Sequence, residues 1–290
     1  MRVLVTGAGG FIGRVLVRQL LERGHDVVGM DVGPNPTEAA GWLRVDPDER
    51  FDTDGLPDGI NAVAHLAQSP AYRLGAAGEE AVFQTNLGLL SDLLRWADSS
   101  GVEGFVAAST GTVYEPFDGA MHEDARVRPT GYYGASKLAA EVLADAYRDR
   151  IRIAHLRLFF VYGPHQSGML IARLVDSILA GEPVKLPAQG PGLEFVPTYV
   201  DDVARAFVSA VENGWEGPVN VASPQRVTFQ ELLETIGQAA GRDLVVERAG
   251  EAPSQPIVPD LTKLASLMDL SGFTPLDDGI AATVAAARSQ

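Results

Sequence analysis

A glycine-rich turn close to the start of the chain constrains the fold more than any other feature. The turn follows a short apolar run, residues 2–5, and leads into residues 12–21, whose apolar side chains recur at helical spacing. Gly7, Gly10 and Gly13 recur at every third position within the turn. Glycines there permit a tight turn, close packing of helix on strand, and approach of a pyrophosphate group to backbone amides. The pattern therefore predicts a strand, a phosphate-binding turn and a helix, in that order.

Strands and helices continue to alternate after this turn. A second apolar run, residues 26–30, ends on Asp31 and completes a strand–helix–strand unit. The later strands and helices of this alternation are predicted at residues 60–66, 79–99, 104–108, 134–150 and 151–160. The alternation predicts an α/β fold with a doubly wound, mostly parallel Rossmann sheet.

The pattern becomes less regular after residues 161–164, where proline and glycine recur. Residues 198–211 and 219–222 still look like sheet and helix that rejoin the main unit, and two amphipathic helices follow at 229–240 and 276–287. We therefore predict a dinucleotide-binding Rossmann domain and a smaller C-terminal α/β substrate domain. The first comprises residues 1–162 with 196–222, and the second comprises residues 163–195 with 223–290.

Charge and cysteine content exclude several classes of function. The chain has 38 acidic against 23 basic residues, a net charge of −15, which argues against binding to nucleic acid or anionic membranes. Apolar stretches are only as long as strands, and the first residues enter a strand instead of a secretory signal, so we expect a cytoplasmic protein. The chain has no cysteine and five scattered histidines, which predicts no disulfide, thiolate or metal site.

Asp31 ends the second strand, where a carboxylate accepts hydrogen bonds from the adenosine ribose of a dinucleotide. Its negative charge opposes the extra phosphate of NADP, so NAD is the expected cofactor; the alternative is that Asp31 only ends a strand. Arg14 either contacts a 2′-phosphate or lies toward solvent or the pyrophosphate. Asp46, after a short apolar run, is either an adenine ligand or an ordinary loop acid.

Tyr133 and Lys137 are spaced to lie on one face of a helix that starts near Tyr132. A nearby cation favours the phenolate of a tyrosine, whose ordinary pKa of about 10 makes it a poor base at neutral pH. Lys137 is also placed to hold the nicotinamide ribose. Alone, this spacing also fits an ordinary amphipathic helix; after a nucleotide-binding turn it predicts a reacting pair. Tyr132 has no lysine at the same spacing.

Hydroxyl side chains follow the strand predicted over residues 104–108. Ser109, Thr110 and Thr112 lie just after it, at the edge where ligands of an open α/β sheet gather. A hydroxyl there can hydrogen-bond a substrate oxygen, and the alternative is ordinary turn chemistry.

These motifs resemble the extended short-chain dehydrogenase/reductase family, the sugar-nucleotide epimerases and dehydratases that include UDP-galactose 4-epimerase. The resemblance covers nearly the whole chain and runs through TGAGGFIG (6–13), HLAQ (65–68), STGTVY (109–114), YYGASK (132–137), VYGP (161–164), YVDDVARA (199–206) and VNVAS (219–223). It implies that Tyr133 removes a proton from a sugar hydroxyl while a hydride passes to NAD, with Thr110 and Lys137 assisting. It also implies further cofactor contacts from Phe11, Ile12, Leu66, Ala67, Gln68 and Asn86.

Departures from the family pattern narrow the expected activity. The family's 4,6-dehydratases resemble one another in an Asp-Glu pair after the catalytic threonine, where this chain has Gly111 and Thr112. Neither residue shuttles a proton, which disfavours dehydration by that route, and Thr112 is instead a candidate substrate contact. Phe160, another candidate substrate contact, replaces the usual asparagine, and the basic residue often found near Phe195 is not evident. His165 either touches a phosphate or sugar or is a solvated loop residue.

The leading hypothesis is an NAD-dependent 4-epimerase of a nucleotide-activated sugar, of the UDP-glucose/UDP-galactose type, acting through a transient keto-sugar. The alternatives are a reductase or dehydrogenase of a nucleotide sugar and a protein that binds the dinucleotide without catalysis. The resemblance also implies a homodimer formed through the helices predicted at 79–99 and 134–150. Six leucines either serve that interface or pack on the sheet: Leu89, Leu90, Leu93, Leu94, Leu138 and Leu143.

Overall fold

The computed structural model describes residues 1–36, 41–45, 51–117, 119, 121–251 and 255–289. The chain divides into two compact units. Unit 1 contains Met1–Pro116, Glu123–Leu158 and Ala204–Val221, and unit 2 contains Phe117–His122, Phe159–Val203 and Ala222–Gln290. Residues 117–122, 159–162, 196–203 and 222 thus lie in unit 2, whereas the sequence pattern assigned them to the dinucleotide-binding domain.

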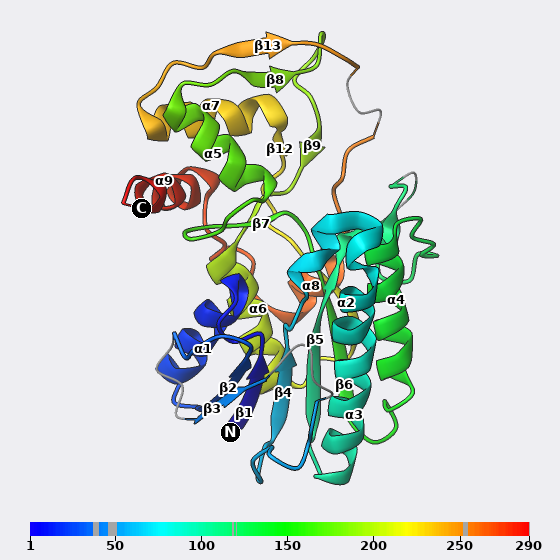
Figure 1. Cartoon of the computed structure of the whole chain (residues 1–290). Helices are drawn as coiled ribbons and strands as arrows, with labels where there is room; N and C mark the ends of the chain where they lie inside the picture. The colour runs from blue at the N-terminus through cyan, green and yellow to red at the C-terminus, as the bar shows by residue number, and fades with distance from the viewer. Residues whose placement is uncertain (37–40, 46–50, 118, 120, 252–254, 290) are drawn as a thin grey trace. The chain divides into compact units, whose positions relative to one another are not determined.

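Unit 1 is built on a parallel sheet (Figure 1). Among the described residues, seven strands form it in the order β11-β6-β5-β4-β1-β2-β3. Their bounds are β1 (Arg2–Thr6), β2 (Asp26–Asp31), β3 (Gly41–Arg44), β4 (Ala62–His65), β5 (Gly104–Thr110), β6 (Arg152–Leu158) and β11 (Gly217–Val221). Every neighbouring pair runs parallel, which confirms the predicted fold class. Because β1 lies between β2 and β4, the strand order reverses beside the glycine-rich turn, where such sheets bind ligands.

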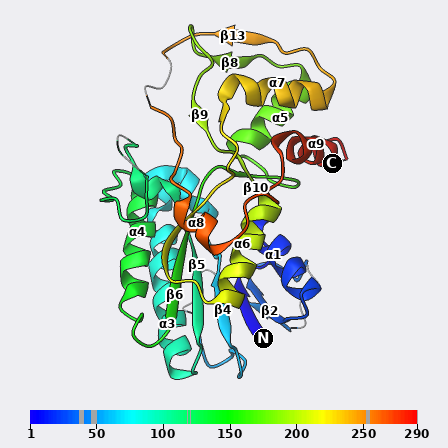
Figure 2. The same ribbon diagram turned by 180° about the vertical axis from the view of Figure 1, so that it is seen from behind.

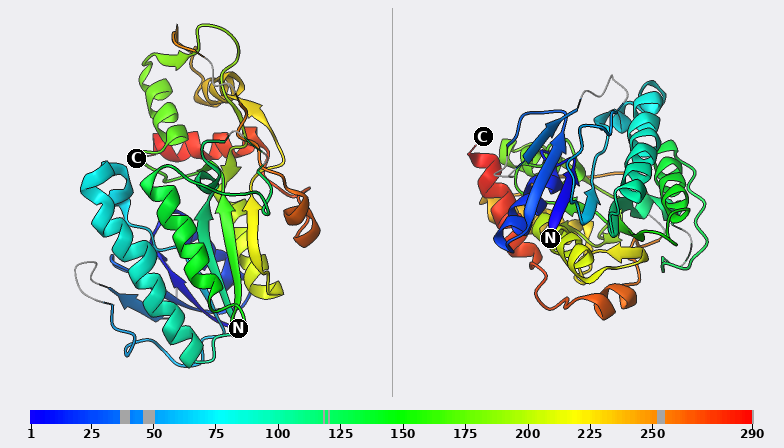
Figure 3. Two further views of the ribbon diagram at one scale, coloured as in Figure 1. Left: turned by 90° about the vertical axis from the view of Figure 1, so that its right-hand side faces the viewer. Right: turned by 90° about the horizontal axis from the view of Figure 1, so that it is seen from below.

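Helices cover both faces of this sheet (Figure 3). On one face, α3 (Leu90–Ser99) lies beside α4 (Tyr132–Asp145). On the other face lie α1 (Phe11–Glu22) and the part of α6 (Val200–Asn213) that belongs to unit 1. The helices alternate with the strands along the chain, as the apolar periodicity predicts.

Three of the six leucines assigned two possible roles lie in the core of unit 1. Leu90, Leu93 and Leu94 on α3 are at most 1% exposed and belong to one apolar cluster with strand residues such as Phe105. These three leucines therefore pack on the sheet.

Residues 79–99 are helical throughout, but they do not form one α-helix. α2 (Glu79–Phe83) passes into a π-helical stretch, η2 (Gln84–Leu89), before α3 begins, and a 3₁₀-helical segment, η1 (Pro70–Gly78), precedes α2. The wider π turn changes which side chains face inward, and Asn86 is buried there. α4 begins at Tyr132 as predicted but ends at Asp145, before the predicted end at residue 150.

The described residues of unit 2 form three longer helices and short strand pairs (Figures 1 and 2). Its helices α5 (Leu170–Ala180), α7 (Phe229–Ala240) and α9 (Leu276–Arg288) pack together, and α8 (Thr262–Leu267) is shorter. The strand pairs are β7 (Val161–Tyr162) with β10 (Thr198–Tyr199), β9 (Glu194–Phe195) with β12 (Val227–Thr228), and β8 (Val184–Leu186) with β13 (Val246–Arg248). The sequence pattern predicted α7 and α9, but not α5 or these strands.

Within the described ranges, no helix combines the length and apolarity needed to cross a bilayer. The same part of the chain contains no group of three or more His, Cys, Asp or Glu side chains arranged to hold a metal ion.

Candidate active site

The glycine-rich turn joins β1 to α1 with little space for side chains. Gly7 has φ of +68°, in the left-handed region, and its carbonyl accepts a hydrogen bond from Gly10 N at 3.0 Å. A Cβ added to Gly13 would lie 2.0 Å from the Gly7 oxygen, so α1 can approach the turn only with glycine there. Phe11 and Ile12 begin α1, and the amides of a first helical turn have no intrahelical acceptor. The turn therefore forms a cradle for an anionic group at the positive end of a helix.

Asp31 lies beside this cradle. One carboxylate oxygen, Oδ2, accepts from Gly9 N at 2.8 Å, and Oδ1 accepts from Val32 N at 2.7 Å. A carboxylate has further lone pairs, so Asp31 can accept ribose hydroxyls while it holds the turn. Arg14 Nε donates to the Gly10 carbonyl at 3.4 Å, so this side chain lies along the first turn of α1. Asp46 lies outside the described residues.

The end of β4 meets the same turn through Thr6. Leu66 N donates to the Thr6 carbonyl at 3.1 Å, and Ala67 N donates to Thr6 Oγ1 at 3.2 Å. Gln68 Nε2 donates to the Ser69 carbonyl, whereas its buried Oε1 has no hydrogen-bond partner within the described chain. A buried acceptor of this kind fits a site that a polar ligand completes.

Asn86 contacts the helix that carries Tyr133. Its side-chain Nδ2 donates to Ser136 Oγ at 2.9 Å, and Ser136 Oγ donates to the Tyr133 carbonyl at 2.8 Å. The Oδ1 atom of Asn86 is buried with no partner among the described residues. The structure therefore places the Asn86 amide group against α4 and leaves its contact with the cofactor a prediction.

The structure brings Tyr133, Lys137 and Thr110 together. The start of α4 packs closely against η3 (Gly111–Tyr114), the segment that follows Thr110. A Cβ added to Gly134 would lie 2.9 Å from the Thr112 carbonyl oxygen. The Thr110 hydroxyl is hydrogen-bonded to the Tyr133 phenol. Lys137 Nζ donates to the Ala108 carbonyl at 3.2 Å.

Thr112 is hydrogen-bonded to Thr110. Its backbone N–H and its hydroxyl both donate to Thr110 Oγ1, at 3.2 and 3.1 Å. These two hydrogen bonds fix the position of the Thr110 oxygen. The predicted contact between Thr112 and substrate remains a prediction.

Burial controls the protonation of this group. It raises the pKa of Tyr133 to about 12, with a further rise from the adjacent Tyr72 phenol, while the hydrogen bond with Thr110 lowers it. Burial lowers the pKa of Lys137 to about 8, and the Glu141 carboxylate partly offsets this effect. The expectation that Lys137 lowers the pKa of Tyr133 is therefore not met in this structure, where desolvation dominates.

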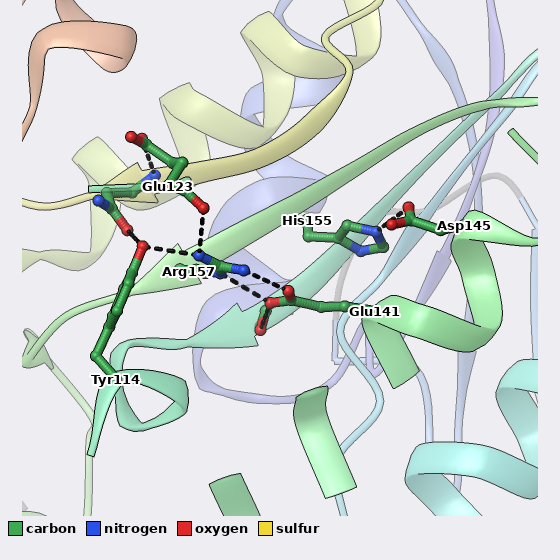
Figure 4. A network of polar contacts seen from close by, with 8 residues as sticks. Tyr114, Glu123, Glu141, Asp145, His155 and Arg157 are labelled. Atoms are coloured by element: carbon green, nitrogen blue, oxygen red, sulfur yellow. Dashed lines mark hydrogen bonds and ion pairs between the residues drawn. The ribbon is translucent and has the colours of Figure 1, made fainter. Parts of the chain in front are cut away.

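Glu141 lies one helical turn beyond Lys137 and is almost fully buried. It accepts a hydrogen bond from Ser109 Oγ, the residue before Thr110, and pairs with the Arg157 guanidinium of β6. Arg157 Nη2 and Nε donate to the two Glu141 oxygens at 2.7 and 3.1 Å (Figure 4). A residue of α4 is thus joined to the residue beside Thr110.

Arg157 extends this network to the residues that follow Thr110. Its Nη1 donates to Tyr114 Oη at 2.7 Å and to the Glu123 carbonyl at 3.2 Å (Figure 4). The Tyr114 phenol donates in turn to Asn220 Oδ1 on β11 at 2.9 Å. Sequence reasoning missed this network, although Glu141 continues the helical spacing of Tyr133 and Lys137.

Phe160 and His165 belong to unit 2. Both have positive φ, +42° and +65°, which is uncommon for residues other than glycine. The Phe160 ring packs edge-on against Phe195, with centroids 4.8 Å apart, and His165 is exposed. Phe160 thus packs its ring against another aromatic ring, and the predicted substrate contacts of Phe160 and His165 remain predictions.

The fold and the site together define a class of protein: dinucleotide-dependent enzymes that act on hydroxyl or carbonyl carbons. The defining features are the doubly wound sheet, the glycine cradle with an acid beside it, and the Tyr–Lys–Thr group. Residues 3–222 match the family model described as the NAD dependent epimerase/dehydratase family. The chain belongs to this family and is an NAD-dependent enzyme.

Relatives of known sequence and structure match the chain along nearly its whole length. It is 28% identical to an uncharacterised UDP-glucose epimerase of Bacillus subtilis, over 98% of this chain and 97% of the relative. It is 31% identical to dTDP-glucose 4,6-dehydratase of Streptomyces griseus, over 98% and 93%. The crystal structure of UDP-glucuronic acid 4-epimerase from Bacillus cereus in complex with NAD superposes with a TM-score of 0.87, at 28% identity, covering 100% of this chain and 99% of that one.

Proposed function

We propose that this enzyme is a 4-epimerase of a UDP-activated hexose or hexuronic acid. The observation that carries the proposal is the hydrogen bond between the Tyr133 phenol and Thr110, with Lys137 one helical turn away. This arrangement suits removal and return of one hydroxyl proton. The Bacillus relatives described above, a UDP-glucose epimerase and a UDP-glucuronic acid 4-epimerase, support the substrate class.

The residues of the cradle fit the cofactor. Gly7 and Gly13 leave room that a Cβ would fill, and Asp31 is placed to accept ribose hydroxyls. The orphaned Oε1 of Gln68 supplies a further acceptor. NAD bound there would supply a hydride acceptor that becomes a hydride donor in the second half of the reaction. The Asp31 carboxylate favours NAD because it would repel the additional phosphate of NADP.

Each reacting residue has a defined role in this proposal. Tyr133 takes the proton of the sugar hydroxyl as that carbon becomes a ketone, and returns it when the alcohol is re-formed on the opposite face. Thr110 holds the substrate oxygen and the phenol in one hydrogen-bonded line. The Lys137 ammonium, kept near the site by the Ala108 carbonyl, would hold the nicotinamide ribose of the cofactor. The reaction involves no net oxidation.

The residues after Thr110 argue against dehydration. Elimination of water requires an acid and a base beside the keto-sugar, and Gly111 and Thr112 occupy those places. The Thr112 hydroxyl is directed at Thr110 Oγ1. A threonine hydroxyl so held has no pKa suited to proton transfer at neutral pH.

The test uses purified enzyme with UDP-glucose, UDP-galactose and UDP-glucuronic acid, without added cofactor. Interconversion of one of these with its C4 epimer, with NAD retained on the protein, is the expected result. Stoichiometric release of NADH or NAD with a changed oxidation state of the sugar would identify a dehydrogenase or reductase and contradict the epimerase. Protein treated to remove its dinucleotide provides the control and should regain activity with NAD.

We also propose that the enzyme is a homodimer joined through α4 and the helices before it. Apolar residues line a hollow of about 880 Å³ on the surface of α4, among them Leu138 and Val142, which is 66% exposed. Phe83 on α2 is a further exposed apolar side chain, at 47%. Light scattering should report twice the mass of 30.8 kDa for the native chain and the mass of one chain for Val142→Arg. A monomeric native protein would contradict the proposal.

A further inference from the structure

The ring of Tyr72 lies against the ring of Tyr133. The two ring centroids are 4.9 Å apart and the ring planes are inclined by 30°, an offset stack. Tyr72 belongs to η1, a segment to which no motif drew attention. A tyrosine ring has few staggered side-chain conformations, so a neighbour on one face restricts which of them Tyr133 adopts.

The segment that carries Tyr72 is closed on itself and tied to α4. Ser69 Oγ caps its start by accepting from Ala71 N at 3.2 Å. At its end, a Cβ added to Gly78 would lie 1.9 Å from the Ala71 carbonyl oxygen, so the two ends can meet only with glycine there. The Tyr132 phenol, from the first residue of α4, donates to the Glu79 carbonyl at 3.1 Å. These contacts hold the segment beside Tyr133.

Other contacts hold the Tyr72 side chain and the far end of the Tyr133 phenol. Arg73 Nε donates to the Tyr72 phenol oxygen at 3.2 Å, and the guanidinium carbon is 5.4 Å from the Tyr72 ring centroid. Thr110 is hydrogen-bonded to the Tyr133 oxygen. Thr110 therefore fixes the position of that oxygen, whereas the Tyr72 ring restricts the tilt of the Tyr133 ring.

We propose that Tyr72 is a positioning residue of the reaction centre, whose ring holds the Tyr133 phenol in the orientation in which it meets Thr110. The proposal rests on Tyr133 as the base, as proposed above. The ring performs this task, so phenylalanine can replace Tyr72 and an aliphatic residue cannot. The Tyr72 oxygen has a separate effect, because it raises the pKa of Tyr133.

The kinetic test compares Tyr72→Phe with Tyr72→Leu. We expect Tyr72→Leu to lower kcat about tenfold to a hundredfold, as small misplacements of a reacting group do, with KM nearly unchanged. Tyr72→Phe should restore kcat to near the native value. Leu74→Ala is the matched control, because Leu74 lies in the same segment and is 65% exposed. Should Tyr72→Leu fail to fold, Tyr72→Met gives the same comparison of ring against aliphatic chain.

A second readout requires neither substrate nor turnover. The chain has seven tyrosines, so carbon-13 labelling of the tyrosine rings gives a resolvable set of NMR signals, and Tyr133→Phe identifies the Tyr133 signal. We expect that signal to move in Tyr72→Leu because the stacked ring is lost. In Tyr72→Phe the Tyr133 signal should titrate at lower pH than in the native protein, because the Tyr72 oxygen that raises its pKa is absent.

Two results would overturn the positioning role of Tyr72. One is native kcat together with an unmoved Tyr133 signal in Tyr72→Leu. The other is a Tyr72→Phe variant as slow as Tyr72→Leu, which would assign the effect to the hydroxyl. Failure of the proposed function gives different results: full turnover in Tyr133→Phe, or no turnover of any nucleotide sugar. In either case the NMR comparison needs no turnover, and it still decides whether the Tyr72 ring positions the Tyr133 ring.

Discussion

Glu141 and Arg157 form a two-pronged ion pair in the interior of unit 1, with side chains that are only 6% and 5% exposed. Glu141 lies one turn beyond Lys137 on α4, and its carboxylate also accepts from Ser109, next to Thr110. A buried carboxylate and a buried guanidinium each need the other, because an unpaired charge in the interior loses its hydration without compensation. The pair therefore connects the stability of the sheet to the position of α4, which carries Tyr133 and Lys137.

Replacing Glu141 by Gln should strongly destabilise the protein. The substitution leaves the Arg157 charge buried without a counter-charge, and removing one partner of such a pair costs about 3–5 kcal/mol. Chemical denaturation followed by circular dichroism measures the free energy of unfolding. The matched control is Asp145→Asn. It alters another contact between α4 and β6, the one between His155 and the Asp145 carboxylate, and the Asp145 side chain is 45% exposed. Equal losses in the two variants would show that the Glu141 pair has no special weight.

Replacing Tyr133 by Phe should reduce kcat by about 10²–10⁴-fold, the range typical of a lost general base. NAD affinity should change little, because the ring and its stack with Tyr72 remain. The matched control is Tyr147→Phe, which removes the hydroxyl of a tyrosine that lies beyond the end of α4 and packs against the apolar core of unit 1. Turnover of a nucleotide sugar and NAD fluorescence quenching are the two measurements. Native turnover in Tyr133→Phe would eliminate the proposed base.

Replacing Asp31 by Ala should weaken the preference for NAD over NADP. The change removes both a ribose acceptor and the charge that would repel the 2′-phosphate, so the ratio of the two dissociation constants should move toward one by about tenfold or more. Asp26→Ala, at the exposed start of the same strand, is the control and should leave the ratio unaltered. A ratio that also stays constant in Asp31→Ala would refute this role of Asp31.

Replacing Gly13 by Ala should impair dinucleotide binding. The added methyl would lie 2.0 Å from the Gly7 oxygen, a clash with rigid backbone that forces α1 away from the turn. Such overpacking costs about 1–3 kcal/mol, which is about tenfold to a hundredfold in NAD affinity if the strain acts on the cradle. Gly104→Ala serves as the control, since its Cβ would meet only the Ala62 methyl group, at 3.8 Å. Equal NAD affinity in both variants would argue against a role for this close approach.

The protein should lose stability in mild acid through His65. Burial, with a smaller contribution from Lys137, lowers the pKa of His65 to about 3, so the folded state keeps it neutral. The unfolded chain binds a proton below its ordinary pKa of about 6.5, and the free energy of unfolding should then fall by about 1.4 kcal/mol per pH unit between those two values.

His65→Gln should remove this dependence while it keeps a polar group near Thr6 Oγ1, which lies 2.8 Å from His65 Nδ1. Urea unfolding at pH 7 and pH 5 should therefore show a loss on acidification that is about 2 kcal/mol smaller in the variant than in the native protein. Losses of the same size in both proteins would show that His65 is not responsible.

Local sequence predicts those parts of the structure that local interactions form. The strand, turn and helix at Gly7 to Gly13 follow from apolar spacing and from glycines whose positions a close backbone approach requires. α7 was predicted with its observed bounds, and Thr228 and Glu231 form a reciprocal cap at its start. In both cases the determining residues are near neighbours in the chain, so the pattern in the sequence already contains the physical cause.

Short strands and side-chain networks depend on residues that are distant in sequence. The pair β9 and β12 has two residues in each strand, too few for any periodicity to appear, and forms only because the chain returns to bring Val227 opposite Phe195. The partners of Arg157 similarly come from three separate segments of the chain. No local pattern can show that these groups become buried together.

The glycine turn, the Tyr133–Lys137 spacing and the NAD-dependent class were determined by the sequence itself, because each depends on neighbours along one turn or one helix. The tertiary structure alone decided that Tyr72 lies on Tyr133, that Lys137 is held by the Ala108 carbonyl, and that burial raises the pKa of Tyr133. Desolvation and aromatic stacking arise only when distant segments exclude water from one another. For this reason the candidate residues of the site can be predicted from the sequence, but their orientation and protonation cannot.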